Sequence, residues 1–150
     1  NIRDYLYEII NSFREISKKE FVFNFDQDSN PKKISKSIEI VYGLRNFIGN
    51  ANKFAKDSIF INLKSDSEIT EITVEDDGDG YPRDIISKIG EPYLKSNYSK
   101  DKSKEGLGLG LFIGKTLLEK NFASVNCRNS KTRNGAEVVI RWKNKELFNI

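Results

Sequence analysis

The chain has 150 residues, and its 25 Lys and Arg against 22 Asp and Glu give a formal net charge of +3. This length fits one domain that folds without disulfides, and the interleaving of acidic and basic residues argues against a nucleic-acid-binding surface. The chain has no His, which excludes imidazole catalysis and a phosphorylated His on this segment, and its single Cys, Cys127, excludes an intramolecular disulfide and a four-thiolate zinc site.

The sequence also bears on the compartment and on the parent protein. No stretch approaches the roughly 18 apolar residues of a membrane span, and no signal peptide opens the chain. One cysteine fits a reducing compartment, so we expect this segment in the cytoplasm, or in the cytoplasmic portion of a longer membrane-bound protein. The chain begins at Asn1 and not at Met, and we expect it to be a piece of a longer protein.

Apolar periodicity predicts an alternation of helices and strands along the chain. The expected elements, in chain order, are a helix over 2–16, a strand over 21–25, a long helix over 37–55, a hairpin with strands over 58–64 and 69–75, a short helix over 82–89, a helix over 107–120, and strands over 123–129 and 135–142. This order predicts a two-layer α/β sandwich with a mixed sheet and helices on one face. Residues 95–105 are almost wholly Lys, Ser, Asp and Asn, which predicts a mobile loop.

The first candidate motif is the acidic, glycine-containing segment Asp76–Gly80 at the end of a predicted strand. A carboxylate held at the end of a buried strand is suited to accept the exocyclic amine of adenine, and the glycines allow the backbone to turn close to a ligand. Taken alone, such a segment is more often an ordinary Asp-Gly turn after a strand.

The second motif is the glycine-rich segment Gly106–Leu111 at the start of a predicted helix. Glycines there expose backbone N–H groups, and the positive end of the helix dipole favours phosphate. The following Gly-Lys-Thr is not a P-loop, because three residues separate Gly110 from Gly114 where a P-loop has four. Gly114 then lies inside the helix, where we expect it to permit close packing.

The third motif lies on the long predicted helix. Asn46, Asn50 and Lys53 share one face of that helix through their spacing of four and three residues. Amides and an ammonium on one face are suited to a phosphate-bound Mg²⁺ and to the phosphates themselves, although a solvated helix face has the same composition.

Together, in this order and on these elements, the motifs resemble the catalytic ATP-binding domain of sensor histidine kinases, in the superfamily shared with DNA gyrase and MutL. The segments that carry the resemblance are an N box at 43–55, a first glycine box at 76–80, an F box at 90–93, a second glycine box at 106–111, and a remnant of a third at 135–136. Residues 90–93 and 111–119 look most like the RegB/PrrB redox-responsive type. The redox Cys of that type is expected elsewhere, and Cys127 in a predicted strand is expected to be structural.

The resemblance implies a fold of the Bergerat type, with ATP and Mg²⁺ as ligands. It implies that Asn46, Asn50 and Lys53 are the catalytic residues, with Asn50 as the Mg²⁺ ligand. The implied nucleotide-binding residues are Asn50, Lys53, Phe54, Asp76 at the adenine, Gly78, Gly80, Tyr93, Gly106, Leu107, Gly108, Leu109, Gly110 and Leu111. The loop over 95–105 would be the lid. The chain departs from the family pattern at 121–123, which replaces a glycine pair, and at Ala136, which replaces a common Thr.

Asn46 bears on the reaction. In the hydrolases and serine kinases of the superfamily the residue four before the metal-binding Asn is typically Glu, a base, whereas Asn46 accepts no proton. A neutral imidazole needs no strong base, so Asn46 favours transfer to a His and argues against a serine kinase of the anti-sigma type.

The sequence therefore predicts the ATP-binding catalytic domain of a two-component histidine kinase. The γ-phosphate would go to a His on a separate dimerisation segment of a homodimeric parent, and from there to a response regulator, with no nucleic acid and no direct membrane contact by this segment. Residues 1–18 would be a helical connector or the end of a dimerisation helix, 19–143 the ATP-binding domain, and 144–150 a C-terminal tail. The alternative is a nucleotide-binding interaction or regulatory module without phosphotransfer.

Overall fold

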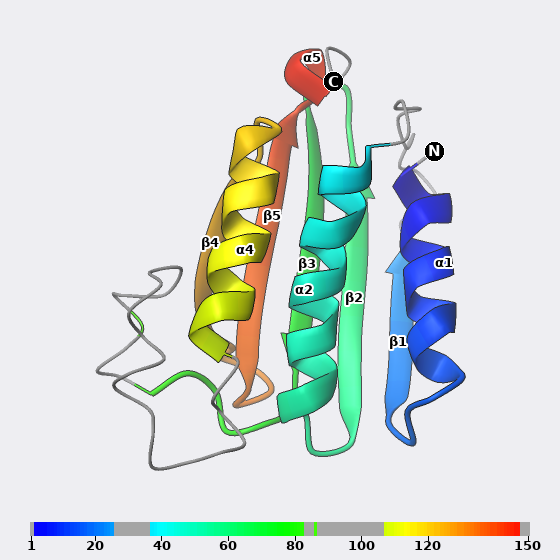
Figure 1. The fold of residues 1–150 in the computed structure, drawn as a ribbon, viewed down its shortest axis with the longest axis vertical. Helices are drawn as coiled ribbons and strands as arrows, with labels where there is room; N and C mark the ends of the chain where they lie inside the picture. Colours follow the sequence, from blue (N-terminus) through cyan, green and yellow to red (C-terminus); the bar gives the residue numbers. More distant parts are fainter. Residues whose placement is uncertain (1, 26–36, 83–85, 87–106, 148–150) are drawn as a thin grey trace.

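A computed structural model of the chain describes residues 2–25, 37–82, 86 and 107–147 (Figure 1). The elements, in chain order, are α1 (Ile2–Arg14), β1 (Glu20–Phe25), α2 (Ile38–Phe54), β2 (Ser58–Ser65), β3 (Ile69–Asp76), α4 (Leu107–Lys120), β4 (Ser124–Asn129), β5 (Ala136–Lys143) and α5 (Asn144–Leu147). The long elements begin and end within two residues of the predicted ones. Of the short helix expected over 82–89, only Pro82 and Ile86 are described, and the loop over 95–105 lies outside the described residues.

The sheet is mixed and has five strands in the order β1-β2-β3-β5-β4. β1 runs parallel to β2, as expected for two strands joined through a helix, here α2. β2 and β3 form the predicted antiparallel hairpin, and β5 pairs with both β3 and β4. β5 therefore lies beside β3, which precedes it by more than 60 residues, and both strands lie inside the sheet.

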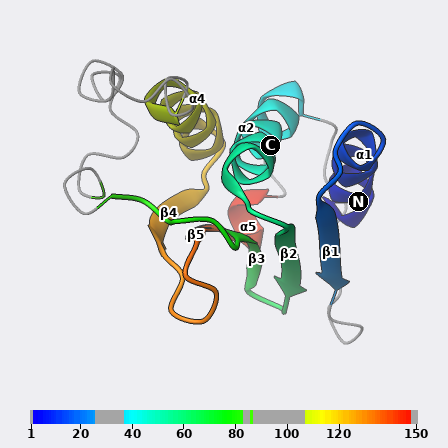
Figure 2. The same ribbon diagram turned by 90° about the horizontal axis from the view of Figure 1, so that it is seen from below.

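Figure 2 shows α1, α2 and α4 on one face of the sheet. Alternate residues of the central strands point to these helices and are buried, as the strand period of two requires. They include Ile59, Ile61 and Leu63 of β2, Ile72 and Val74 of β3, and Val138, Ile140 and Trp142 of β5. The predicted two-layer α/β sandwich with helices on one face is confirmed.

Charged side chains lie on the opposite face of the sheet, which none of these helices covers. Glu71 and its direct cross-strand partner Arg141 form an ion pair with a 2.6 Å N–O distance. Arg128 and its cross-strand partner Glu137 form a second one. Opposite charges placed in register stabilise neighbouring strands and keep this face solvated.

Two glycines let α2 and α4 pack closely. At Gly43 a Cβ atom would lie 2.7 Å from Cγ of Leu118, and at Gly114 a Cβ would lie 2.8 Å from the ring of Phe47. The helices are antiparallel, because Glu39 near the start of α2 pairs with Lys120 at the end of α4. The close-packing role expected of Gly114 is confirmed.

Both ends of α2 are fixed by side chains. The hydroxyl of Ser37 accepts a hydrogen bond from the N–H of Ile40 at 3.3 Å, which caps the first turn. At the other end, Nζ of Lys19 donates to the carbonyl oxygens of Asn52 and Lys53. A cation at this end also complements the helix dipole.

The terminal helices pack on the same core. α1 buries Ile2, Leu6, Ile9 and Ile10, and α5 buries Asn144 and Leu147. Asn144 donates to the carbonyl of Asp66 and accepts from Thr70, so the segment expected as a tail is helical and fixed over residues 144–147. Among the described residues no helix has the length and apolar character needed to cross a membrane.

Candidate nucleotide-binding site

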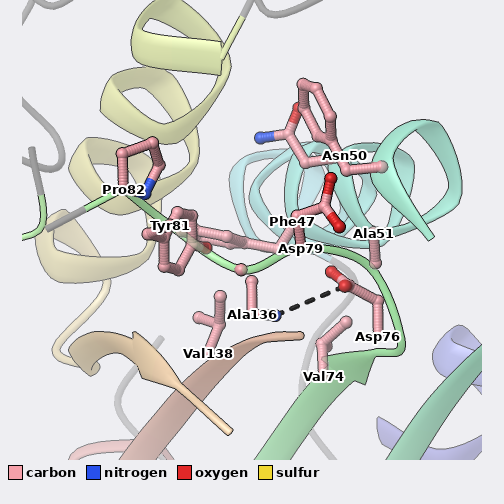
Figure 3. A pocket seen from close by; sticks show the side chains of 12 residues that line it. Phe47, Asn50, Ala51, Val74, Asp76, Asp79, Tyr81, Pro82, Ala136 and Val138 are labelled. Carbon is pink, nitrogen blue, oxygen red and sulfur yellow. Dashed lines mark hydrogen bonds between the residues drawn. The ribbon is translucent and has the colours of Figure 1, made fainter. Parts of the chain in front are cut away.

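A pocket lies between α2, the end of β3 and the start of β5 (Figure 3). Its walls are mainly apolar, and its polar groups converge from α2 and from the turn after β3. The described residues that line it are Phe47, Asn50, Ala51, Phe54, Val74, Asp76, Asp79, Gly80, Tyr81, Pro82, Ala136 and Val138. An apolar slot with a few placed polar groups is typical of small-molecule sites.

Asp76, the last residue of β3, is only 3% exposed within this pocket. Its Oδ1 accepts hydrogen bonds from the N–H of Gly78 at 2.8 Å and of Ala136 at 3.3 Å. Figure 3 shows the second of these bonds crossing from β5 to β3. Burial raises the pKa of Asp76, and the two N–H groups offset this only in part. Among the described residues none donates to Oδ2, which leaves one acceptor oxygen for a ligand.

The backbone segments around Asp76 approach one another so closely that side chains would not fit between them. A Cβ at Gly78 would lie 2.2 Å from the carbonyl oxygen of Phe54, and a Cβ at Gly135 would lie 1.9 Å from that of Asp76. Gly80 has a φ of +80°, a conformation that residues with a Cβ rarely adopt. These glycines bring three segments distant in sequence together beneath the pocket.

Asp77 follows Asp76 in sequence, but its carboxylate contacts the backbone of residues 56–58. Its two carboxylate oxygens accept hydrogen bonds from the N–H groups of Lys56, Asp57 and Ser58, at 2.8 to 3.2 Å. Burial acts to raise the pKa of Asp77, but these N–H groups outweigh it and lower the pKa below its ordinary value. Asp77 thus fixes the turn between α2 and β2.

Asn50 projects from α2 into the pocket (Figure 3), where its Nδ2 is buried without a hydrogen-bond partner among the described residues. A Cβ at Gly110 of α4 would lie 3.2 Å from this nitrogen and 3.3 Å from Oδ1. An orphaned buried amide is costly unless a ligand satisfies it. Asn50 is therefore suited to bind a polar ligand, and its amide oxygen is of the kind that coordinates Mg²⁺.

Four of the predicted site residues line the pocket: Asn50, Phe54, Asp76 and Gly80. Lys53 does not; it is exposed, and its ammonium lies 5.4 Å from the centre of the Phe54 ring. Asn46 does not either, because its Nδ2 donates to the carbonyl of Tyr42 on the same helix at 2.8 Å.

Gly110 of α4 lies against Asn50, and the other predicted residues of the second glycine box and the F box divide into three groups. Leu111 is fully buried in the hydrophobic core. Leu107, Gly108 and Leu109 form the first turn of the helix, where the structure describes the backbone only. Gly106, like Tyr93 of the F box, lies outside the described residues.

The apolar walls include residues to which the sequence analysis gave no role. Val74 stands two before Asp76, so strand alternation alone places it on the same face. Val138 lies opposite Val74 on β5. This pairing joins segments more than 60 residues apart, and no local pattern in the sequence indicates it.

The segment leaving the pocket is attached to β4 through Tyr81. Asn129 accepts from the N–H of Tyr81 at 2.6 Å and donates to its carbonyl at 2.9 Å. The Tyr81 side chain is hydrogen-bonded to Cys127, and burial raises the pKa of that thiol to about 11. Cys127 is therefore a protonated thiol at neutral pH, as a structural role requires.

The family described as "Histidine kinase-, DNA gyrase B-, and HSP90-like ATPase" has a model that matches residues 35–146. The match covers more than half of the chain and includes every described residue that lines the pocket. The chain belongs to this ATPase family.

Among known proteins, the sensor histidine kinase RegB of Cereibacter sphaeroides is 39% identical over 97 residues, which are 61% of this chain and 21% of RegB. The expected resemblance to the RegB type is thereby confirmed. The catalytic domain of the histidine kinase ThkA, in a nucleotide-free form, has a TM-score of 0.77 at 21% identity and covers 95% of this chain and 94% of that one. Full-length ShkA in complex with AMPPNP has a TM-score of 0.75 at 21% identity, and the match covers 95% of this chain and 30% of ShkA. These structures share the fold, and the chain spans about a fifth of the length of RegB.

Proposed function

We propose that this chain is the ATP-binding catalytic domain of a two-component sensor histidine kinase, with adenine bound at Asp76. The observation that carries the proposal is the buried carboxylate at the base of an apolar slot. Two backbone N–H groups hold one oxygen of Asp76, and the other is left to accept the exocyclic amine of adenine. A charged acceptor in a dry site contributes about 1.5–3 kcal/mol to such a hydrogen bond.

The phosphates would extend from this slot toward Asn50 and the start of α4. The first turn of a helix favours phosphate through its free N–H groups and its dipole, and Gly110 lies against Asn50. Lys53 is exposed close by and would reach the phosphates from solvent, while Gly106, Leu107, Gly108, Leu109 and Leu111 would shape this end of the site.

Asn50 would be the Mg²⁺ ligand. The described residues contain no cluster of three His, Cys, Asp or Glu that would hold a metal. Mg²⁺ at nucleotide sites typically takes one or two protein oxygens and completes its shell with phosphate oxygens and water, which suits a single amide ligand. The ion neutralises charge on the β- and γ-phosphates when it is bound.

The proposed reaction is transfer of the γ-phosphate to a His on a separate dimerisation segment of the parent protein. Asn46 supports a reaction that needs no protein base, because its amide accepts no proton and its nitrogen is engaged with Tyr42. The protein's contribution is then to position the nucleotide and to neutralise charge. A response regulator would receive the phosphate next.

The proposed parent is a homodimer whose kinase part lies in the cytoplasm. Residues 1–18 would be the connector to the dimerisation segment, and 19–143 the nucleotide-binding unit. The packing of α1 supports a connector that is coupled to the nucleotide-binding unit, because its buried residues share one core with those of α2.

Phosphotransfer is tested by supplying a His-bearing dimerisation segment as a separate polypeptide, together with labelled ATP and Mg²⁺. We expect label on that segment and none on this chain, which has no His. Asn46→Glu introduces a carboxylate base and should speed release of free phosphate. Binding of ATP without transfer would instead indicate the alternative, a nucleotide-binding regulatory module.

A further inference from the structure

Glu75 is a buried acidic residue that the proposed chemistry does not use. It precedes Asp76 on β3 and therefore points to the opposite face of the sheet, away from the nucleotide pocket. It is nevertheless only 6% exposed. A carboxylate this buried is retained only where partners compensate for its lost hydration.

The partners of Glu75 all come from the turn between β4 and β5. Oε2 accepts hydrogen bonds from the hydroxyls of Ser130 and, at 3.4 Å, Thr132. Oε1 lies 3.5 Å from Nε of Arg133. The guanidinium of Arg133 in turn lies 3.5 Å from the centre of the Phe60 ring on β2, which covers the ion pair.

Ser130 organises the rest of this turn. Because its hydroxyl hydrogen is donated to Glu75, its oxygen accepts from the N–H groups of Thr132 at 3.3 Å and Arg133 at 3.1 Å. The N–H of Ser130 donates to the carbonyl of Gly135 at 2.7 Å, which closes the turn. The path of residues 130–135 thus depends on the carboxylate of Glu75.

The far end of the turn lies against Asp76. Gly135 touches the Asp76 backbone so closely that no Cβ fits, and the next residue, Ala136, donates its N–H to Oδ1 of Asp76. A displacement of the turn by a few tenths of an ångström would lengthen this 3.3 Å bond beyond hydrogen-bonding range.

We propose that Glu75 is a positioning residue for adenine recognition: from the open face of the sheet it holds the β4–β5 turn so that the N–H of Ala136 stays on Asp76. The role rests on the proposed function of Asp76. Glu75 touches no nucleotide; it acts by keeping one oxygen of Asp76 occupied, so that the other is aimed at the amine.

The test compares binding of ADP with that of purine riboside diphosphate, which lacks the 6-amino group, by calorimetry. The wild-type chain should prefer ADP. In Glu75→Ala the preference should fall about tenfold, the size expected when one charge-assisted hydrogen bond is lost. Glu75→Gln, which still accepts from Ser130, should recover part of it. The control is Glu71→Gln, on the same strand and face and also ion-paired, which should keep the wild-type preference.

Selectivity for the amine separates positioning from a purely structural role. If Glu75 were only structural, Glu75→Ala would lower the melting temperature and leave the ratio of the two affinities unchanged. If Glu75→Ala fails to fold, the same two affinities are measured in Ser130→Ala. We expect the preference for ADP to fall in that variant too. A wild-type preference retained in Glu75→Ala, or in Ser130→Ala, overturns this proposal alone. A wild-type chain that binds both nucleotides equally overturns the adenine role of Asp76 with it.

Discussion

Asp76 and Asp77 are neighbours in sequence whose carboxylates have opposite pKa shifts. Asp76 is buried and receives two N–H hydrogen bonds on one oxygen, so burial dominates and its pKa is raised. Asp77 receives N–H hydrogen bonds on both oxygens, and its pKa is lowered. Asp77 therefore stabilises the fold as a carboxylate, whereas Asp76 is a charge that the unliganded fold keeps at a cost.

This difference predicts that Asp76→Asn stabilises the unliganded chain at neutral pH. The folded protein binds a proton on Asp76 more readily than the unfolded chain, so stability falls as pH rises from the ordinary pKa of 3.8 to the raised folded value, and the loss persists above it. The gain from Asp76→Asn should therefore be larger at pH 7 than at pH 3.5. Urea unfolding at the two pH values measures it, and equal differences at both would contradict the raised pKa.

Asp77→Asn should have the opposite effect. The stabilisation by Asp77 is fully present above its unfolded pKa and is lost as pH falls through its lowered folded pKa. We expect a loss of about 1 kcal/mol at pH 7, discounted for the solvent exposure of this turn, that shrinks toward zero in acid. Urea unfolding across the acid range provides the measurement. A loss that stays constant with pH would mean that the carboxylate charge is not what holds residues 56–58.

At the scale of elements, the contact between α2 and α4 is set by glycine. The close approach at Gly43 and Gly114 carries Asn50 of α2 up to Gly110 of α4. Gly49 lies on the same helix as Gly43, but there a Cβ would meet only the ring of Phe13 at 3.5 Å, an ordinary contact. Substitutions at Gly43 and Gly49 therefore distinguish the effect of helix propensity from that of packing.

Gly49→Ala should stabilise the chain by up to about 1 kcal/mol, because alanine loses less entropy in a helix. Gly43→Ala gains the same propensity but forces Leu118 and α4 away, at a cost of about 1–3 kcal/mol, and should be destabilising overall. Thermal unfolding of both variants gives the signs. Equal stabilisation by both would show that α4 is not packed on Gly43.

The end of α4 is closed by a Schellman motif with an unusual residue. The N–H of Phe122 donates to the carbonyl of Glu119, and that of Ala123 donates to Leu118. The position between helix and strand that favours glycine is occupied by Phe122, with a φ of 72° and 52% exposure. This replacement within 121–123 leaves the fold intact but places a bulky residue in the left-handed region.

Phe122→Gly should therefore stabilise the chain, by about 1 kcal/mol, since the left-handed conformation costs a residue with a Cβ about 1–2 kcal/mol and little apolar burial is lost. Asn134→Gly is the matched control: Asn134 also has a positive φ, of 63°, but asparagine tolerates it. Chemical unfolding should show a clear gain for Phe122→Gly only. A loss of stability would mean that the Phe122 side chain supplies packing that outweighs the strain.

At the scale of the whole molecule, local patterns predicted the elements well. Helical spacing defines α2, and strand alternation defines β2 and β3. The carboxylate at the end of β3 and the polar face of α2 predicted Asp76 and Asn50, and both line the pocket. What local patterns did not supply is pairing at long range and side-chain direction.

Two cases show the limit. The pocket wall at Val138 and the turn that holds Asp76 exist only because β5 inserts beside β3. Asn46 shares its helical face with Asn50, as its spacing requires, but its amide bonds to its own helix instead of entering the pocket. Spacing fixes the face of a helix, whereas competition for hydrogen bonds decides where a polar side chain points.

The central claim is that an adenine nucleotide binds with its amine on Asp76, and titration calorimetry with an ATP analogue and Mg²⁺ tests it most directly. The account predicts binding to the wild-type chain and a sharp loss in Asp76→Asn, whose amide offers a donor where adenine needs an acceptor. Glu71→Gln is the control, because it removes a carboxylate charge from the same strand on the face opposite the pocket, and it should bind nearly as well as wild type. Equal binding by the wild-type chain and Asp76→Asn would place the nucleotide elsewhere and contradict the account.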